Sequence, residues 1–324
     1  MKKITQTVLM VFLAFGISGQ FFTSLAWAQQ ALSDSRIETE RQADIEGLSQ
    51  LGRKTTEVFK PRPEDITAPS SPGDDALGQQ YLLKRKSEYE PFSFFGNIAG
   101  NWTSNVALTK NNPQSDNYIV TTAGVSYQPI IRPNLLGEIT AMQQWFRYDR
   151  FPDMNFNSLN LGAGLSYAIP ELSNLAVFGR YNYNRLTDTD GASEYLRNHS
   201  VTLGFFKTFP LSRAHYLYGG YSSQFGFSDP KIYQRDYHSV IGGYNLDITS
   251  KLSFDVSIRV SYIPYQEDGR EDYNECFSLG MTYKPKPWLI LTFSSFAAFN
   301  QSKNSVFEYN AVNLSPNIGI RIKF

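Results

Sequence analysis

Cysteine, histidine and long apolar runs are scarce in this 324-residue sequence. The single cysteine, Cys276, has no partner for an internal disulfide and cannot supply a cysteine-based metal site. After residue 28 no run reaches the roughly 18 apolar residues that a transmembrane helix needs, which excludes a helical membrane protein. Basic and acidic residues both number 30, so no excess of positive charge points to nucleic acid as a partner.

Aromatic residues, in contrast, are abundant, with 24 Phe, 20 Tyr and 4 Trp. A soluble protein would have to bury most of these rings. A β-barrel in lipid can display them outward at the two membrane interfaces.

The N-terminus predicts a cleavable signal peptide over residues 1–28. Lys2 and Lys3 form a positive start, and residues 8–17 form an apolar stretch that is short for a membrane span. Ala26-Trp27-Ala28 fits the small-x-small cleavage pattern. The alternative is an uncleaved anchor.

Residues 29–91 form a polar segment that we expect in the periplasm, partly helical or disordered. Residues 35–52 can form a helix, and a linker rich in Pro and Ser follows over 61–73. The apolar residues of that helix lie roughly on one face: Ile37, Ile45, Leu48 and Leu51.

From Phe92 to Phe324 the hydrophobic pattern has a period of two. The clearest stretch is 158–169, where apolar residues alternate with Ser, Asn and Gly, and 252–262 repeats the pattern. Successive side chains of a strand point to opposite faces, so one face suits lipid and the other water.

The alternation predicts an all-β protein, an antiparallel up-and-down transmembrane barrel of about twelve strands. The expected strands are 94–108, 118–128, 135–148, 157–169, 175–186, 199–209, 215–227, 238–249, 252–264, 275–284, 288–299 and 311–324. Connections alternate between short, mostly Pro-marked turns and longer polar loops, which is typical of outer-membrane barrels. An even strand number places the first and the last residue of the barrel segment on the same side of the membrane, the periplasmic side.

The last strand ends at Phe324, with Ile322, Ile320 and Ile318 on the same face. In this it resembles the terminal strand of bacterial outer-membrane proteins. The resemblance implies an outer-membrane location and recognition by the barrel-assembly machinery. Pro316 lacks an N–H group, so we expect a bulge or weakened pairing there.

Aromatic residues near the predicted strand ends suggest two interfacial belts. The outer belt would contain Trp145, Tyr148, Tyr181, Tyr183, Phe225, Phe227 and Tyr262, and the periplasmic belt Tyr127, Tyr167, Phe209, Tyr283, Trp288 and Phe324. Lipid and lipopolysaccharide are the partners that such a surface implies.

The sequence offers little that indicates catalysis. Outer-membrane phospholipase A carries a His and a Ser two residues apart, whereas His199-Ser200 and His238-Ser239 are adjacent and must split across the two faces. The acidic loop 266–272 lacks the spacing of a calcium loop. We therefore expect no enzyme, no cofactor and no metal.

The predicted inner face is mostly amides and hydroxyls, with sparse charges of both signs. Glu138, Arg180, Asp255 and Arg259 are the candidate lumen residues that shape a constriction. The pattern favours a porin-like channel for passive diffusion of small, mostly neutral hydrophilic solutes. Two alternatives remain: a structural or assembly protein whose segment 29–91 binds a periplasmic partner or plugs the barrel, and a lipid-modifying enzyme.

Overall fold

The computed structural model describes residues 89–324, except 174, 213 and 268. The expected signal peptide, the predicted helix 35–52 and the rest of the segment up to residue 88 lie outside the described residues. Within the described part, no helix is long and apolar enough to cross a membrane.

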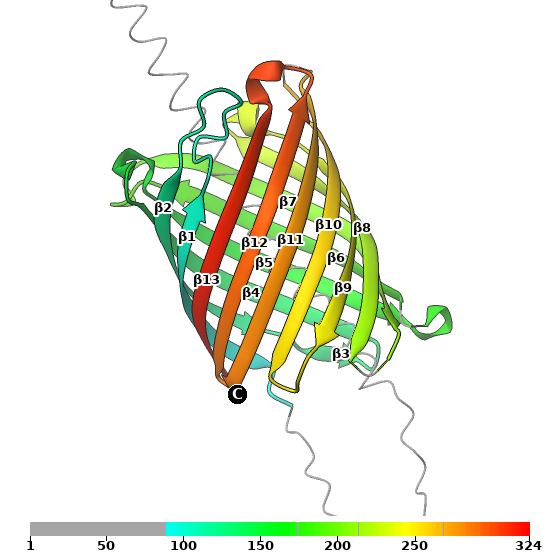
Figure 1. Ribbon diagram of the computed structural model, residues 1–324. Helices are drawn as coiled ribbons and strands as arrows, with labels where there is room; N and C mark the ends of the chain where they lie inside the picture. Colours follow the sequence, from blue (N-terminus) through cyan, green and yellow to red (C-terminus); the bar gives the residue numbers. More distant parts are fainter. Residues whose placement is uncertain (1–88, 174, 213, 268) are drawn as a thin grey trace, which may run out of the picture.

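Twelve long antiparallel strands and one short strand form a single closed sheet (Figure 1). Apart from the short β3, each strand pairs with its neighbours in chain order, β2 pairing directly with β4, and β1 also pairs with β13, which closes the barrel. The strands are β1 (Phe92–Thr103), β2 (Asp116–Tyr127), β3 (Ile130–Arg132), β4 (Leu135–Tyr148), β5 (Phe156–Ile169), β6 (Leu175–Thr187), β7 (Glu194–Pro210), β8 (His215–Asp229), β9 (Tyr237–Asp247), β10 (Leu252–Pro264), β11 (Glu271–Lys286), β12 (Leu289–Ser302) and β13 (Tyr309–Lys323). The three-residue β3 lies in the turn between β2 and β4, so twelve strands make the wall, as predicted.

The two ends of the barrel differ in their connections. Short turns join strands at the end that holds Phe92 and Phe324, which we call the turn end. Longer connections join them at the opposite end, the loop end, and include 104–115 and 230–236. With an even number of strands, the turn end faces the periplasm.

Several strands extend further toward the loop end than the sequence predicted. β7 begins at Glu194 rather than at residue 199, and β11 begins at Glu271 rather than at residue 275. Ion pairs bridge these extensions, with Arg185 Nε 2.6 Å from Glu194 Oε2 and Lys303 Nζ 2.6 Å from Glu271 Oε1. The sequence analysis ended each strand where charged residues interrupt the apolar–polar alternation. Charged residues can nevertheless continue a strand when they pair with opposite charges on the neighbouring strand.

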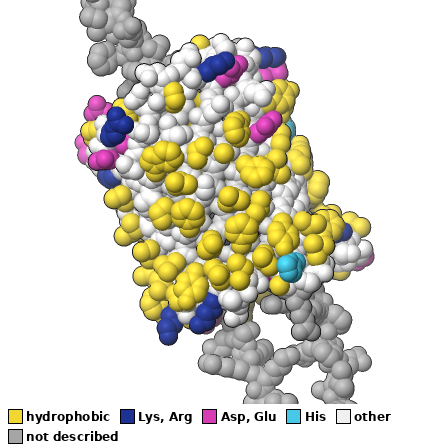
Figure 2. All heavy atoms as spheres, viewed as in Figure 1, with side chains coloured by type: hydrophobic (Ala, Val, Ile, Leu, Met, Phe, Trp, Pro, Cys, Tyr) yellow, Lys and Arg dark blue, Asp and Glu magenta, His cyan; other side chains and the backbone are white. Residues whose placement is uncertain are grey.

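The outer face of the barrel is apolar over its middle. Large hydrophobic side chains alternate with inward residues along most strands, for example Leu161 and Leu165 on β5 and Ile318 and Ile320 on β13. Figure 2 shows these side chains covering the wall on one side of the molecule, with charged groups gathered toward the two ends. A closed barrel with this exterior satisfies its backbone in lipid, which places the protein in the bacterial outer membrane.

One residue of the predicted outer belt is on the other face. Tyr148 is buried inside the barrel, where its ring stacks on Tyr118 at a centroid distance of 4.9 Å. Trp145 and Tyr148 are three residues apart on β4, so they must point to opposite faces. Assigning both to one belt was wrong.

Pro316 leaves the register of the last strand intact. β13 keeps a constant register with β1 on both sides of the proline, but the two positions opposite Pro316 and Ser315 are missing from the ladder. Pairing is thus weakened on the β1 side without a bulge, because proline cannot donate a ladder hydrogen bond.

Candidate functional site in the lumen

The four predicted lumen charges lie on the inner face in two groups. Glu138 on β4 and Arg180 on β6 form one group, and Asp255 and Arg259 on β10 form the other. Their sequence neighbours Ile139, Tyr181 and Ile258 are exposed on the outer face. In the ring of twelve strands β10 is six positions from β4 and four from β6, so the groups lie on different parts of the wall. The structure does not bring all four together.

The first group is an ion pair that crosses a strand. Arg180 Nη2 lies 3.1 Å from Glu138 Oε2, although β5 runs between β4 and β6. Gly164 on β5 is paired with both residues. A Cβ atom at Gly164 would lie 2.7 Å from Cγ of Arg180, so the glycine provides the space through which the arginine passes.

The second group repeats this arrangement with a tyrosine. Tyr218 Oη on β8 donates to the Asp255 carboxylate, 3.0 Å from each oxygen, across β9. Gly243 lies beneath the ring, because a Cβ atom there would be 2.3 Å from Cζ of Tyr218. Arg259 lies four residues from Asp255 on the same face, roughly 13 Å farther along β10.

Aromatic rings connect these two groups along the wall. Phe178 lies over Gly204, and the Phe206 ring packs against Gly220, each glycine being its partner on the next strand. The Phe206 and Tyr218 rings stack at 5.5 Å, and the Arg180 guanidinium is 5.7 Å from the Phe178 ring. Sequence reasoning missed this row of Phe178, Phe206 and Tyr218. The signal that could have indicated the row is an inward aromatic residue whose partner on the next strand is a glycine.

Much of the remaining wall is neutral and polar. Ser239 and Ser261 hydroxyls bond at 2.8 Å, and Asn184 donates to Asn160 at 3.1 Å and to the Leu159 carbonyl at 2.9 Å. Such groups bond to one another and to water or polar solutes.

The loop-end mouth has a dense group around Arg270. Its guanidinium lies between the rings of Tyr265, at 4.1 Å, and Phe307, at 3.7 Å. It also forms an ion pair with buried Asp272, which accepts a further bond from Asn300 at 3.0 Å. These contacts join the β10–β11 and β12–β13 loops.

Two carboxylates of the acidic loop 266–272 have ion-pair partners. Glu271 and Asp272 belong to β11, where they point to opposite faces and pair with Lys303 and Arg270. Among residues 89–324 that the structure describes, no group of three or more His, Cys, Asp or Glu side chains could hold a metal ion.

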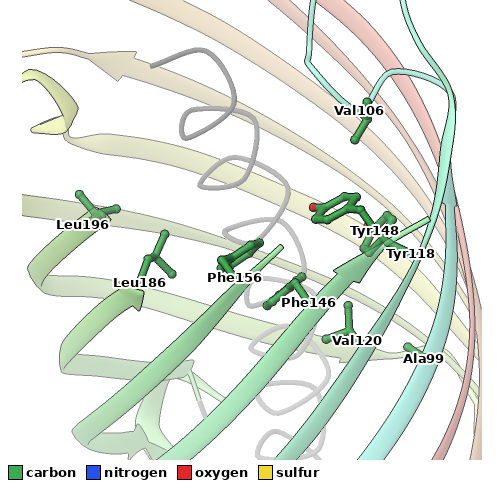
Figure 3. Packing of buried hydrophobic residues seen from close by; sticks show 9 residues of the cluster. All are labelled: Ala99, Val106, Tyr118, Val120, Phe146, Tyr148, Phe156, Leu186 and Leu196. Carbon is green, nitrogen blue, oxygen red and sulfur yellow. The ribbon is translucent and has the colours of Figure 1, made fainter. Parts of the chain in front are cut away.

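An apolar patch lines the inner wall near the loop end, which the sequence reasoning also missed. We call it the inner apolar patch: Ala99, Val106, Tyr118, Val120, Phe146, Tyr148, Phe156, Leu186 and Leu196 (Figure 3). Strand register assembles it, since Ala99, Val120, Phe146 and Phe156 are successive partners across β1, β2, β4 and β5. The Phe146 and Phe156 rings stack at 4.2 Å. Phe151, Met154, Tyr195 and Tyr233 pack against the patch, whose members are 1–8% exposed, so these apolar side chains are already removed from water.

All three histidines face outward and bond tyrosine hydroxyls. His199 Nδ1 lies 2.7 Å from Tyr181 Oη, and His215 bonds Tyr244. His238 Nδ1 lies 3.3 Å from Tyr221 Oη and also 3.0 Å from Ser223 Oγ. This Ser–His contact joins β8 and β9, so it could not be found from residues adjacent in sequence.

Comparisons with known proteins show the fold only. No protein-family model matches the chain, and no curated protein matches it significantly. An outer-membrane channel from Pseudomonas putida F1 has a TM-score of 0.50 at 9% identity, over 73% of this chain and 99% of that one. The translocator domain of the autotransporter NalP from Neisseria meningitidis has a TM-score of 0.43 at 10% identity, over 89% and 98%. The first of these likenesses agrees with the geometry of the strands: the chain has the fold of a bacterial outer-membrane β-barrel.

Proposed function

We propose that the protein is a porin-like channel through which small, mostly neutral hydrophilic solutes diffuse, without a cofactor. The observation that supports this proposal is the polar part of the inner wall. Amides and hydroxyls on most strands point into a closed barrel, and charges of both signs are few. A lining of this kind replaces water around a neutral polar solute without selecting strongly for one ion.

In this proposal the Glu138–Arg180 pair and the Tyr218–Asp255 contact, on neighbouring parts of the wall, line one side of the constriction. Because each charged group is held by a partner across a glycine, its position is fixed. Arg259 is a further charge on this path, farther toward the loop end.

Single-channel recording in planar bilayers tests the proposal. We expect Arg180→Ala and Asp255→Asn to change conductance and to shift the reversal potential in a salt gradient in opposite directions. Lys207→Ala removes a charge from the outer face and serves as the control. Folded wild-type protein that never conducts would refute the channel.

The second candidate is a barrel that anchors segment 29–91 or is plugged by it. The inner apolar patch favours this candidate, because buried apolar side chains inside the loop end take up space that a passage for hydrophilic solutes would need. Conductance that rises when the segment is deleted would support a plug. A periplasmic protein recovered only when the segment is present would support an anchor.

A further inference from the structure

We propose that the periplasmic mouth of the barrel binds the carboxylate or phosphate group of a soluble anionic solute. The site consists of four basic residues at the turn end, which we call the mouth cations: Lys251, Lys284, Arg321 and Lys323. The neutral hydrophilic body of the same solute would pass the amides and hydroxyls of the lumen. The role of the site rests on the proposed channel, whereas binding itself can be measured without conduction.

The mouth cations lie on neighbouring strands and point inward. Arg321 and Lys323 flank Ile322 on β13, whose side chain is exposed on the outer face, so alternation directs both into the mouth. Lys284 on β11 follows the outward Tyr283 and points inward for the same reason. One strand, β12, separates β11 from β13, so these groups are roughly 10 Å apart across the sheet. Figure 2 shows Lys and Arg side chains gathered at this end of the molecule.

Two of the mouth cations are directly opposite each other. The backbone N–H of Lys284 donates to the Lys251 carbonyl at 2.7 Å, which continues the pairing of Leu252 with Tyr283 by one residue. Residues that are opposite each other in an antiparallel pair share a face, so both lysines border the mouth. Like charges in this arrangement repel each other and destabilise the sheet. An anion bound beside the two ammonium groups would offset that repulsion.

None of the mouth cations forms an ion pair within the described part of the chain. There, Nε of Arg321 is buried without a hydrogen-bond partner, and its guanidinium is 5.8 Å from the Phe95 ring. Acidic groups on β9 to β13 at the same end are Asp247 and the terminal carboxylate of Phe324. Four basic groups therefore leave this side of the mouth with an excess of positive charge, and their side chains are exposed or half-buried rather than covered.

The loop end has the opposite arrangement. Five of its basic residues form ion pairs: Lys110–Glu308, Arg185–Glu194, Arg197–Asp229, Arg270–Asp272 and Lys303–Glu271. Arginine and lysine side chains line pores that select for anions and phosphate. A guanidinium can also bind two oxygens of one carboxylate or phosphate. The asymmetry between the two ends gives the periplasmic mouth the stronger attraction for an anionic group.

Calorimetric titration of the folded full chain in a zwitterionic detergent tests binding, with tripolyphosphate and citrate as the probes. Lys284→Gln combined with Arg321→Gln removes two mouth cations. Lys286→Gln is the matched control, because Lys286 pairs with Leu289, whose other partner Ile320 is on the outer face. We expect the double variant to lose about tenfold or more in affinity and the control less than about twofold. No binding by the wild type, or an equal loss in the control, overturns the proposal.

A second titration distinguishes a soluble solute from a lipid headgroup. Phosphatidylglycerol added to the micelles presents its phosphate at the level of the bilayer surface, whereas the inward mouth cations face the aqueous passage. We expect tripolyphosphate and citrate to bind whether or not this lipid is present. If phosphatidylglycerol binds through Lys284 and Arg321 while the soluble probes do not bind, the site takes a headgroup and the proposal is refuted.

The site and the channel fail in different ways. In a salt gradient across a planar bilayer, the double variant should shift the reversal potential toward cation selectivity, and Lys286→Gln should leave it unchanged. If the soluble probes bind and the folded protein never conducts, the anion site stands and the channel is refuted. If the channel conducts and the probes do not bind, the anion site is refuted and the channel stands.

Discussion

Replacing Gly243 by alanine should destabilise the barrel although the substitution adds a single methyl group. The new Cβ atom would lie 2.3 Å from Cζ and 2.4 Å from Oη of Tyr218, so the ring must leave its place. The ring then loses its hydroxyl contact with Asp255 and its stacking on Phe206, which are 3.0 Å and 5.5 Å in the native barrel.

The size of the effect follows from these contacts. A hydrogen bond to a charged group stabilises by about 1.5–3 kcal/mol. The aromatic pair adds about 0.5–1.5 kcal/mol. Alanine in place of a strand glycine recovers about 0.5–1 kcal/mol of backbone entropy. The expected net loss in the free energy of unfolding is therefore about 1–4 kcal/mol.

Equilibrium unfolding in denaturant, with the protein in detergent micelles or lipid vesicles, measures this loss. Gly242→Ala is the matched control, because its Cβ atom would meet nothing closer than 4.0 Å. In a Tyr218→Ala background Gly243→Ala should cost nothing, since the ring that it displaces is gone. Equal stabilities of Gly242→Ala and Gly243→Ala would refute the reasoning.

Three further predictions concern the charge pair, the last residue and the outward histidines. Arg180→Ala leaves Glu138 unbalanced, so the reversal potential should shift toward cation selectivity by a few millivolts or more in a tenfold salt gradient; no shift places the pair outside the ion path. Deleting Phe324 removes its edge contact with Phe94, at a centroid distance of 5.8 Å, and should lower the heat-modifiable folded fraction in the outer membrane; an unchanged fraction contradicts a role in assembly. Phospholipid vesicles incubated with the protein should release no fatty acid, and His238→Ala should leave that result unchanged; release that the variant abolishes would establish a hydrolase.

The sequence predicted the barrel because its main signal is local. Alternation along 158–169 and 252–262 assigns each residue to a face before any strand pairing is known, and the structure keeps both assignments. The rhythm of short and long connections then determines the order of the strands. Tyr148 was assigned to the wrong face because the period-two alternation was not applied to it. The start of β7 at Glu194 was missed because a charged residue was taken to mark the end of a strand.

The contacts of the site were less predictable because they depend on register between strands. Nothing local to Arg180 indicates that Glu138 lies within reach, since the two residues are 42 positions apart and separated by a strand. The same holds for Ser223 and His238, which are direct partners on β8 and β9. The face to which a side chain points follows from the alternation along its own strand. A contact between side chains depends in addition on the register between two or three strands.

Inward glycines explain why such contacts span two strands rather than one. A side chain that points into the lumen ordinarily contacts the Cβ atom of its partner residue on the next strand, and therefore extends toward the barrel axis. Where the neighbour is glycine, as at Gly164 and Gly243, the side chain lies flat across that strand and reaches the next one. An inward glycine with a long or aromatic residue opposite therefore predicts a group held against the wall, once the register is known. Lying flat keeps these arginine and tyrosine groups at the wall, away from the axis of the barrel. By this reasoning, alanine at Gly164 or Gly243 turns a wall-bound group into an obstruction, so both variants should narrow the passage even though each adds only one carbon atom.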